Sequence, residues 1–310
     1  MKFLLVGGGG YVGATLAQQL EDRGHEVLVA RRHPQAIRGL TQEMQWDATT
    51  EWPHNTPLVD ALVHLASFNG DAKDSPTSAV LNNSTMISNV LNLCERIPGC
   101  GVLYVSSIQV FGHLNGLVSN DTRVQPATEY AKGHWAAEQS VREFAETIAR
   151  PAMIMRLAHV VGGGARQSAI RWSPVPADFC RQAVVDRAIR LRTSGQQFRD
   201  FMSISASTSR LADVLESIEK WDCSTHIIAS GRGMSVVQLA EMVAEICETE
   251  FGYLPEISKD VTGSDVPEGE PLQFVRDSWN SIDLCGSESE RALRDSIAEL
   301  LHAAAKKWRG

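Results

Sequence analysis

The fold is decided by the first residues of the chain, which read KFLLVGGGGYVG from Lys2 to Gly13. A short apolar run leads into four glycines, and a helical pattern follows that ends near Arg23 and Gly24. Glycines at positions 7, 10 and 13 suit a tight turn, close approach to a pyrophosphate, and close packing of a helix on its strand. The N–H groups and the dipole at the start of that helix attract phosphate. The stretch therefore predicts a strand–turn–helix that binds a dinucleotide.

Side chains near this turn indicate which dinucleotide is bound. A second apolar strand, Glu26–Ala30, ends in Arg31 and Arg32, where an NAD-binding protein usually carries an acidic residue for the ribose 2′-hydroxyl. Guanidinium groups suit a 2′-phosphate, so the pair favours NADP over NAD; the alternative is two solvated surface arginines. We expect Asp47 to reach the adenine amino group. The turn residues expected to contact the cofactor are Gly7, Gly10, Tyr11, Val12 and Gly13.

Apolar strands and amphipathic helices alternate through the first half of the chain. The strands are expected at Ala61–Leu65, Val102–Val105 and Met153–Leu157, and the helices at Leu81–Arg96 and Ala137–Ile148. This alternation predicts an α/β fold with a doubly wound, Rossmann-like parallel sheet. Later expectations are a strand at His226–Ala229, a helix at Met234–Thr249 with Ser235 as its N-cap, and a final helix at Glu288–Trp308.

The regular pattern loosens near Gly162, and residues 165–177 carry two prolines and few periodic signals. We therefore assign residues 1–160 to a dinucleotide-binding domain. Residues 161–310 are assigned mainly to a smaller C-terminal substrate lobe, with residues 200–232 expected to return to the main sheet.

Composition narrows the class of protein. The formal net charge is -8, which argues against a nucleic-acid or anionic-membrane partner because these require a basic face. The six cysteines are dispersed without zinc spacing, so we expect reduced thiols, no metal site and a cytoplasmic location. The N-terminal apolar run is too short for a signal peptide, and no stretch approaches the ~20 apolar residues of a membrane span.

Further motifs follow in a specific order. They are Asp60–Ser67 (DALVHLAS), the helix pair Asn83 and Asn89, Tyr104–Gly112 (YVSSIQVFG), the set Pro126, Tyr130 and Glu138, the segment Arg199–Phe201, and finally Ile227–Ile246 and Asp283–Gly286. Together they resemble the extended short-chain dehydrogenase/reductases, the NAD-dependent epimerase/dehydratase family. The likeness extends over nearly the whole chain.

The resemblance implies hydride-transfer chemistry. Tyr130 corresponds to the family's acid/base, and Ser107 to the serine that bonds the carbonyl oxygen. Arg199 matches an arginine that often binds the phosphate of a nucleotide sugar; the alternative is a pair with a carboxylate. His159 lies in a loop that contacts substrate in relatives, and a homodimer is implied by resemblance alone. Cofactor-binding positions carried over are Leu65, Ala66, Ser67 and Asn83.

The sequence departs from the family at the catalytic helix. Position 134 is His, where the family has a lysine four residues after the tyrosine. Its reference pKa of ~6.5 leaves it mostly neutral at pH 7. Either His134 is a working variant that bonds the ribose and, when protonated, stabilises a tyrosinate, or the tyrosine–lysine mechanism is lost. His159 (commonly Asn) and Gly163 (commonly Pro) also depart, so the substrate is expected to differ from a standard nucleotide sugar. We interpret His64, inside an apolar strand, as a core histidine with satisfied hydrogen bonds.

Three functions remain open. The first is an NADP(H)-dependent oxidoreductase that reduces a ketone or ketosugar, with Ser107, Tyr130 and His134 as catalytic residues. The second is a nucleotide-sugar epimerase or dehydratase that retains NAD. The third is a dinucleotide-binding sensor or scaffold without catalysis, which the missing lysine motivates.

Overall fold

The computed structural model describes residues 1–33, 42–53, 55–68, 76–259, 270–275 and 287–309. They divide into two compact units. Unit 1 contains residues 1–113, 122–157 and 208–228, and unit 2 contains residues 114–121, 158–207 and 229–310. The motif Asp283–Gly286 lies outside the described residues.

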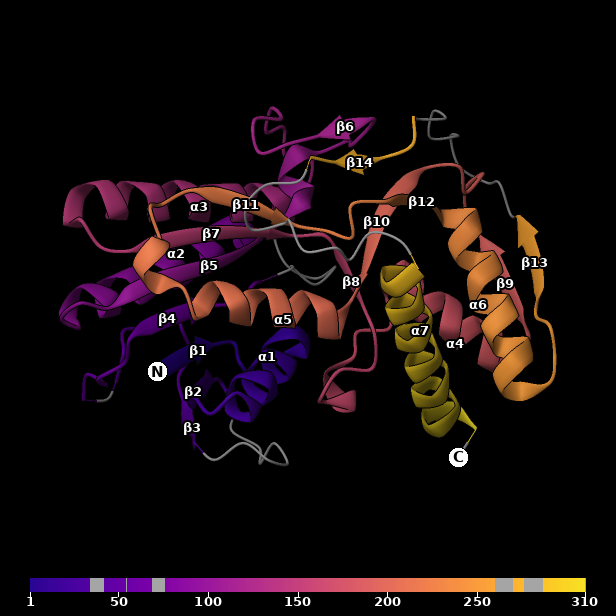
Figure 1. Ribbon diagram of the computed structural model, residues 1–310, viewed down its shortest axis with the longest axis horizontal. Coiled ribbons are helices and arrows are strands. Elements are labelled where there is room, and N and C mark those ends of the chain that lie inside the picture. Colours follow the sequence, from indigo (N-terminus) through magenta and orange to yellow (C-terminus); the bar gives the residue numbers. More distant parts are fainter. Residues whose placement is uncertain (34–41, 54, 69–75, 260–269, 276–286, 310) are drawn as a thin grey trace. The chain divides into compact units, whose positions relative to one another are not determined.

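The centre of unit 1 is a parallel sheet (Figure 1). Its described strands run in the order β11-β7-β5-β4-β1-β2-β3. They are β1 (Lys2–Val6), β2 (Glu26–Arg31), β3 (Gln42–Gln45), β4 (Ala61–His64), β5 (Gly101–Ser107), β7 (Ala152–Leu157) and β11 (Thr225–Ile228). The order reverses between β1 and β4, the point at which doubly wound sheets bind ligands. The expected Rossmann-like α/β fold is confirmed.

Helices cover both faces of this sheet, namely α1 (Tyr11–Asp22), α2 (Pro76–Arg96), α3 (Glu129–Ile148) and α5 (Ile204–Leu215). Alternate strand residues such as Leu4, Leu62 and Tyr104 form one core with α2 and α3. The helix α3 begins eight residues earlier than the sequence predicts, because Thr128 caps it by accepting a hydrogen bond from the Ala131 N–H.

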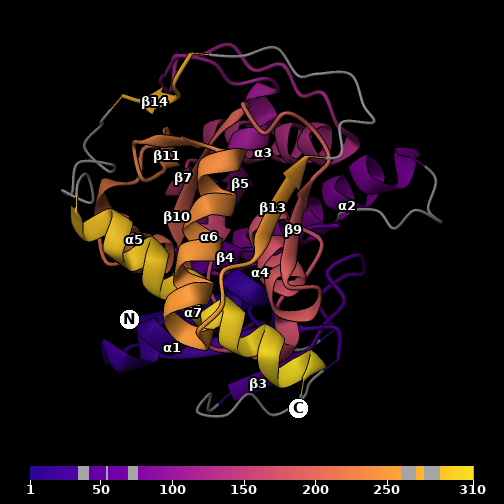
Figure 2. The same ribbon diagram turned by 90° about the vertical axis from the view of Figure 1, so that its right-hand side faces the viewer.

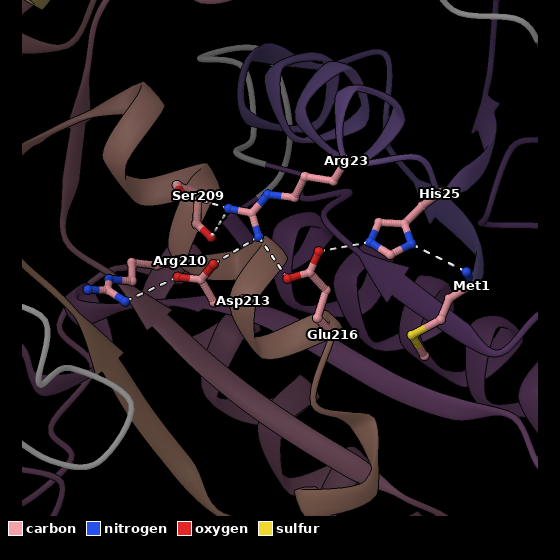
Figure 3. Close-up of polar contacts among 7 residues, drawn as sticks. All are labelled: Met1, Arg23, His25, Ser209, Arg210, Asp213 and Glu216. Atoms are coloured by element: carbon pink, nitrogen blue, oxygen red, sulfur yellow. Dashed lines mark hydrogen bonds and ion pairs between the residues drawn. The ribbon is translucent and has the colours of Figure 1, made fainter.

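A polar cluster joins the end of α1 to α5 (Figure 3). Arg23, the C-cap of α1, donates to Asp213 at 2.8 Å, to Glu216 at 3.0 Å and to the Ser209 hydroxyl at 2.9 Å. His25 bonds Glu216 through its Nε2 at 2.9 Å. The cluster links α1 to residues 208–216, the part of α5 and its C-terminal end that belongs to unit 1, although α5 comes more than 180 residues after α1 in the chain.

Unit 2 combines small sheets with three longer helices (Figure 2). Its sheets are β12-β10-β8, the pair β13-β9 and the pair β14-β6. Their bounds are β6 (Leu117–Val118), β8 (His159–Val161), β9 (Ala188–Leu191), β10 (Phe198–Ser203), β12 (Gly233–Ser235), β13 (Glu256–Lys259) and β14 (Gln273–Phe274). The helices α4 (Val175–Val185), α6 (Val236–Phe251) and α7 (Ser287–Trp308) pack on one another. Ser235 caps α6 in a capping box with Gln238, as expected.

None of the helices in the described part of the chain is long and apolar enough to cross a bilayer.

Candidate functional site

The glycine turn after β1 forms a cradle that a side chain would fill. Gly7 has φ +85°, and a Cβ on it would lie 2.6 Å from the Ala66 N. A Cβ on Gly13 would lie 2.6 Å from the Gly7 carbonyl oxygen. Gly10 is the N-cap of α1 and supplies no side-chain bond, and Tyr11 and Val12 follow as the first helical residues. Glycine backbone and a helix N-terminus together suit the pyrophosphate of a dinucleotide.

The segment after β4 lies beside this turn. Leu65 and Ala66 both donate their N–H groups to the Val6 carbonyl oxygen, at 2.9 and 3.0 Å. Asn83 of α2, 15 residues after Phe68 in the chain, accepts from the Phe68 N–H at 2.8 Å and donates to the Phe68 carbonyl oxygen at 3.2 Å. Asn83 therefore holds the shape of the segment that carries Ser67.

Arg31 and Arg32 differ in their surroundings. A Cβ on Gly9 would come within 2.7 Å of the Arg31 side chain, so Arg31 lies against the glycine turn. Its Nη1 is 3.5 Å from the Glu43 carboxylate of β3. Arg32 is exposed. Asp47 accepts hydrogen bonds from the Thr49 N–H and hydroxyl at 3.0 and 2.8 Å. Burial acts to raise the pKa of Asp47, but these bonds, together with the charges of Arg32 and His33, lower it overall.

Ser107 and Tyr130 lie on adjoining elements of unit 1. Ser107 ends β5, and its hydroxyl accepts from the Gln109 N–H at 3.2 Å. Tyr130 is the second residue of α3, which packs against β5 and the short 3₁₀ helix after it. Lys132 is exposed and pairs with Glu129 at 2.7 Å, so it faces away from this site.

His134 is buried one turn after Tyr130. Its Nδ1 is 2.7 Å from the Tyr104 hydroxyl of β5, and its Nε2 is 3.3 Å from the Ser67 hydroxyl. Its ring meets the Tyr130 ring edge-on, with centroids 4.5 Å apart. Burial lowers the pKa of His134 to about 4, against the opposing field of Glu138. The lowered pKa favours the neutral imidazole at pH 7, as the reference pKa of histidine already suggested.

A second hydrogen bond between β5 and α3 lies beside the bond between Tyr104 and His134. Glu138 accepts from the Ser106 hydroxyl at 2.6 Å. Tyr104 and Ser106 are two residues apart on a strand, a distance of about 6.6 Å, and His134 and Glu138 are four residues apart on a helix, a distance of about 6 Å. Because these spacings are similar, Tyr104 meets His134 and Ser106 meets Glu138. Arg156 of β7 completes the Glu138 contact through its Nε and Nη2, at 2.9 and 2.6 Å.

His64 is a core histidine, as predicted, but the prediction that its hydrogen bonds are satisfied is wrong. Its Nδ1 is buried and has no hydrogen-bond partner among the residues that the structure describes. The ring stacks on Tyr104 with centroids 5.6 Å apart, and burial lowers the pKa of His64 to about 3. A strand position alone could not reveal which groups its ring nitrogens would meet.

The predicted substrate residues lie in unit 2. His159 opens β8, its Nδ1 is 3.3 Å from the Asp200 carbonyl oxygen, and burial lowers its pKa to about 4. Arg199 of β10 donates to the Phe198 carbonyl oxygen at 2.9 Å. No carboxylate of the described residues forms an ion pair with Arg199. The alternative of a carboxylate partner therefore gains no support within the described part of unit 2.

Unit 2 also contains a cavity of about 750 Å³. It is lined by residues of β10, β12, α6, α7 and the chain before β14, among them Phe198, Phe201, Arg232, Met234 and Arg294. Arg199 is not part of its lining. Neither this cavity nor the contacts of Tyr104, Ser106 and Arg156 with α3 could be predicted from the sequence, because they depend on which strand residue faces which helix residue.

Comparison with known proteins defines the class. The sequence profile of the NAD dependent epimerase/dehydratase family matches residues 3–216. The chain belongs to this family, as the motifs indicated.

Individual relatives are more distant. A UDP-2-acetamido-2,6-beta-L-arabino-hexul-4-ose reductase of Pseudomonas aeruginosa is 27% identical over 300 residues, covering 89% of this chain and 72% of that protein. A CDP-paratose 2-epimerase of Salmonella typhi is 21% identical, covering 89% of this chain and 91% of that protein. Among solved structures, RMD from Pseudomonas aeruginosa complexed with NADPH is similar with a TM-score of 0.78 and 19% identity, over 99% and 100% of the two chains. UDP-glucuronic acid 4-epimerase from Bacillus cereus in complex with NAD has a TM-score of 0.76 and 18% identity, over 100% and 98%.

Proposed function

We propose that this protein is an NADP(H)-dependent reductase of a keto group on a nucleotide-linked sugar. The observation that carries the proposal is the burial of His134 one helical turn after Tyr130, against the Tyr130 ring, because this burial favours the neutral imidazole. An epimerase begins by removing a proton from a substrate alcohol, a step that a cation beside the tyrosine assists. Reduction instead needs a tyrosine that gives its proton, and a neutral neighbour leaves Tyr130 in that form.

Residues of unit 1 would orient the carbonyl group and supply the proton in such a reduction. The chemistry that a bound NADPH supplies is hydride delivery to the carbonyl carbon. Ser107 donates a hydrogen bond to the carbonyl oxygen and orients it. Tyr130 gives its phenolic proton to the same oxygen as the alcohol forms. The segment that carries Leu65, Ala66 and Ser67 lies beside the glycine turn and would hold the cofactor with it.

NADP is the proposed cofactor because Arg31 ends β2 and Arg32 follows it. A solved structure similar to this chain is a complex with NADPH, and the relatives include enzymes named as sugar-nucleotide reductases. Asp47 would contact the adenine. One observation favours the alternative of an epimerase that retains NAD: Glu43 lies 3.5 Å from Arg31 and competes with a 2′-phosphate for its charge. Solved structures of similar fold hold NAD as well.

Unit 2 is proposed to bind the substrate, with unit 1 holding the cofactor. Arg199 would pair with a phosphate of the nucleotide. His159, whose Nδ1–H donates to the Asp200 carbonyl oxygen, would accept a hydrogen bond from a sugar hydroxyl through its Nε2. The relatives are named for UDP-, dTDP- and CDP-linked sugars, which supports this substrate class. We also propose a cytoplasmic homodimer, since the described cysteines are free thiols and the family usually dimerises.

The experiment titrates the purified protein with NADPH and with NADH, after a check for nucleotide carried over from the cell. NADPH consumption is then measured with UDP- and dTDP-linked 4-ketosugars. Wild type should bind NADPH and consume it. Tyr130→Phe should lose at least about 100-fold in turnover while it binds NADPH as wild type does.

Tyr253→Phe is the matched control, because Tyr253 belongs to unit 2 and its hydroxyl donates to the Ala183 carbonyl oxygen. Unchanged turnover in Tyr130→Phe would overturn the reductase mechanism. Retained NAD without net NADPH consumption would establish the epimerase alternative. Binding without turnover of any ketosugar would leave a dinucleotide-binding protein without catalysis.

A further inference from the structure

Tyr104, His134 and Ser67 form a chain of hydrogen-bonding groups that starts in the core of unit 1. Tyr104 and His134 are 2% and 3% exposed, and Ser67 is half-buried. They come from β5, α3 and the segment after β4, respectively. The imidazole bonds the tyrosine through Nδ1 and the serine through Nε2. The chain therefore runs from a buried strand to the segment beside the glycine turn.

A neutral imidazole has one donor and one acceptor nitrogen, so two arrangements of hydrogens are possible. In the first, the Tyr104 hydroxyl donates to Nδ1 of His134, and Nε2–H donates to the Ser67 oxygen. In the second, Nδ1–H donates to the Tyr104 oxygen, and the Ser67 hydroxyl donates to Nε2.

The surroundings of Tyr104 distinguish the two arrangements. Among the described residues its hydroxyl has no hydrogen-bond partner besides His134. The second arrangement would bury the phenolic hydrogen without an acceptor, and an unsatisfied buried donor is costly. The first satisfies that hydrogen with a short bond of 2.7 Å to the better acceptor, an imidazole nitrogen. The stacked ring of His64 packs against Tyr104 and helps to enclose it.

We propose that Tyr104 is a positioning residue that fixes His134 as its Nε2–H tautomer, and that this tautomer turns the Ser67 hydroxyl into a donor toward the cofactor. Because Ser67 accepts from His134, its own hydrogen is left for another acceptor. Ser67 is half-buried and directly follows Leu65 and Ala66, whose N–H groups donate to the Val6 carbonyl oxygen beside the glycine turn. A cofactor bound at this turn would therefore offer an oxygen as the acceptor for the Ser67 hydroxyl. The second half of this proposal rests on the proposed function, whereas the first half does not.

The tautomer is measured directly by nitrogen-15 NMR of the ligand-free protein at pH 7. The nine histidines are labelled, and the His134 signals are assigned by comparison with His134→Gln. The expected result is a protonated Nε2 and an unprotonated Nδ1. A protonated Nδ1 would overturn the proposal without the involvement of any cofactor. In Tyr104→Phe the Nδ1 signal should move and the fixed tautomer should be lost, while Tyr253→Phe should leave both unchanged.

The orientation of Ser67 is tested by NADPH titration. Ser67→Ala and Tyr104→Phe should each weaken binding by about fivefold, the value of one hydrogen bond. The double variant should bind no more weakly than Ser67→Ala alone, because both changes remove the same bond. Additive losses would overturn the relay through His134.

Wild-type protein that binds neither nucleotide would refute the proposed function and the cofactor role of Ser67, but the tautomer would still be decided by its spectrum. Thermal unfolding confirms that each variant is folded before titration.

Discussion

Glu138 and Arg156 form a two-point ion pair in the interior of unit 1, with side chains that are 0% and 2% exposed. The carboxylate also accepts from the Ser106 hydroxyl, so both of its oxygens are engaged. The guanidinium lies over the Phe111 ring, 4.7 Å from the ring centroid. This pair fixes α3, the helix of Tyr130 and His134, to β5 and β7.

Removal of one partner from this ion pair should strongly destabilise the protein. Glu138→Gln leaves the Arg156 charge buried without compensation, and we expect it to lower the free energy of unfolding by about 3–5 kcal/mol. Glu129→Gln is the matched control, because the Glu129–Lys132 pair of the same helix lies at the surface, with side chains 34% and 50% exposed, and it should cost below about 1 kcal/mol. Urea unfolding measures both. Equal losses in the two variants would show that burial of the pair does not matter.

The buried His64 and His134 and the half-buried His159 should make the free energy of unfolding depend on pH. Burial lowers the pKa of His64 to about 3, and the pKa of His134 and His159 to about 4. In the unfolded chain these pKa values are about 6.5, so between pH ~6.5 and ~4 the unfolded state binds more protons and stability is lost as the pH falls. Each histidine should contribute roughly 1–2 kcal/mol between pH 7 and pH 5. Asp200, whose pKa burial raises to about 6, opposes this change as the pH falls through that value.

The measurement is chemical denaturation at pH 7 and pH 5. Between pH 7 and pH 5, the free energy of unfolding of His64→Gln should fall by roughly 1–2 kcal/mol less than that of the wild type. His113→Gln, at an exposed position, should behave as wild type does. A His64→Gln variant with the full wild-type loss would contradict the assignment of a depressed pKa to that residue.

Glycine at position 13 should be indispensable for close packing at the turn. An alanine Cβ there would lie 2.6 Å from both the Gly7 oxygen and the Gly8 Cα. Gly13→Ala should therefore cost about 1–3 kcal/mol of stability and weaken nucleotide binding. Gly10→Ala meets only one atom, at 3.1 Å, and should cost less. Thermal unfolding ranks the two variants, and a larger loss for Gly10→Ala would refute the packing argument.

Cofactor preference should respond to the charge on Arg31. Glu43→Gln removes the carboxylate 3.5 Å from its guanidinium and should tighten NADPH binding by about fivefold with little effect on NADH. Arg32→Ala should weaken NADPH binding selectively. Glu26→Gln changes the net charge equally at an exposed position paired with Lys2, and should alter neither affinity. Equal shifts for both nucleotides would exclude recognition of a 2′-phosphate by these arginines.

Much of the fold followed from periodicity and glycine spacing. The strands β1, β2, β4, β5 and β7 have the apolar runs that mark buried parallel strands. The strand β3 was not foreseen, because its sequence Gln42–Gln45 carries three polar residues out of four at the edge of the sheet. The helix α4 was missed because Pro174 and Pro176 suggest a loop, although proline is well suited to the first turn of a helix.

The site was harder to predict than the fold. Motif positions placed Ser107 and Tyr130 on adjoining elements, but the partners of His134 depend on tertiary packing. One signal was available: Tyr104 and Ser106 share a face of β5, as His134 and Glu138 share a face of α3. Which of these polar groups meet, and which nitrogen of His64 stays without a partner, is decided by side-chain directions that a one-dimensional pattern does not contain.

The late return of the chain to unit 1 has a consequence for synthesis on the ribosome. The strand β7 ends at Leu157, but its neighbour β11 begins only at Thr225, so a nascent chain exposes β7 as an open apolar edge while about 70 further residues are made. Release of the chain before Ile228 would leave that edge free to pair with other molecules. Translation that pauses between Leu157 and Ile228 should thus be the stage at which this protein most needs a chaperone.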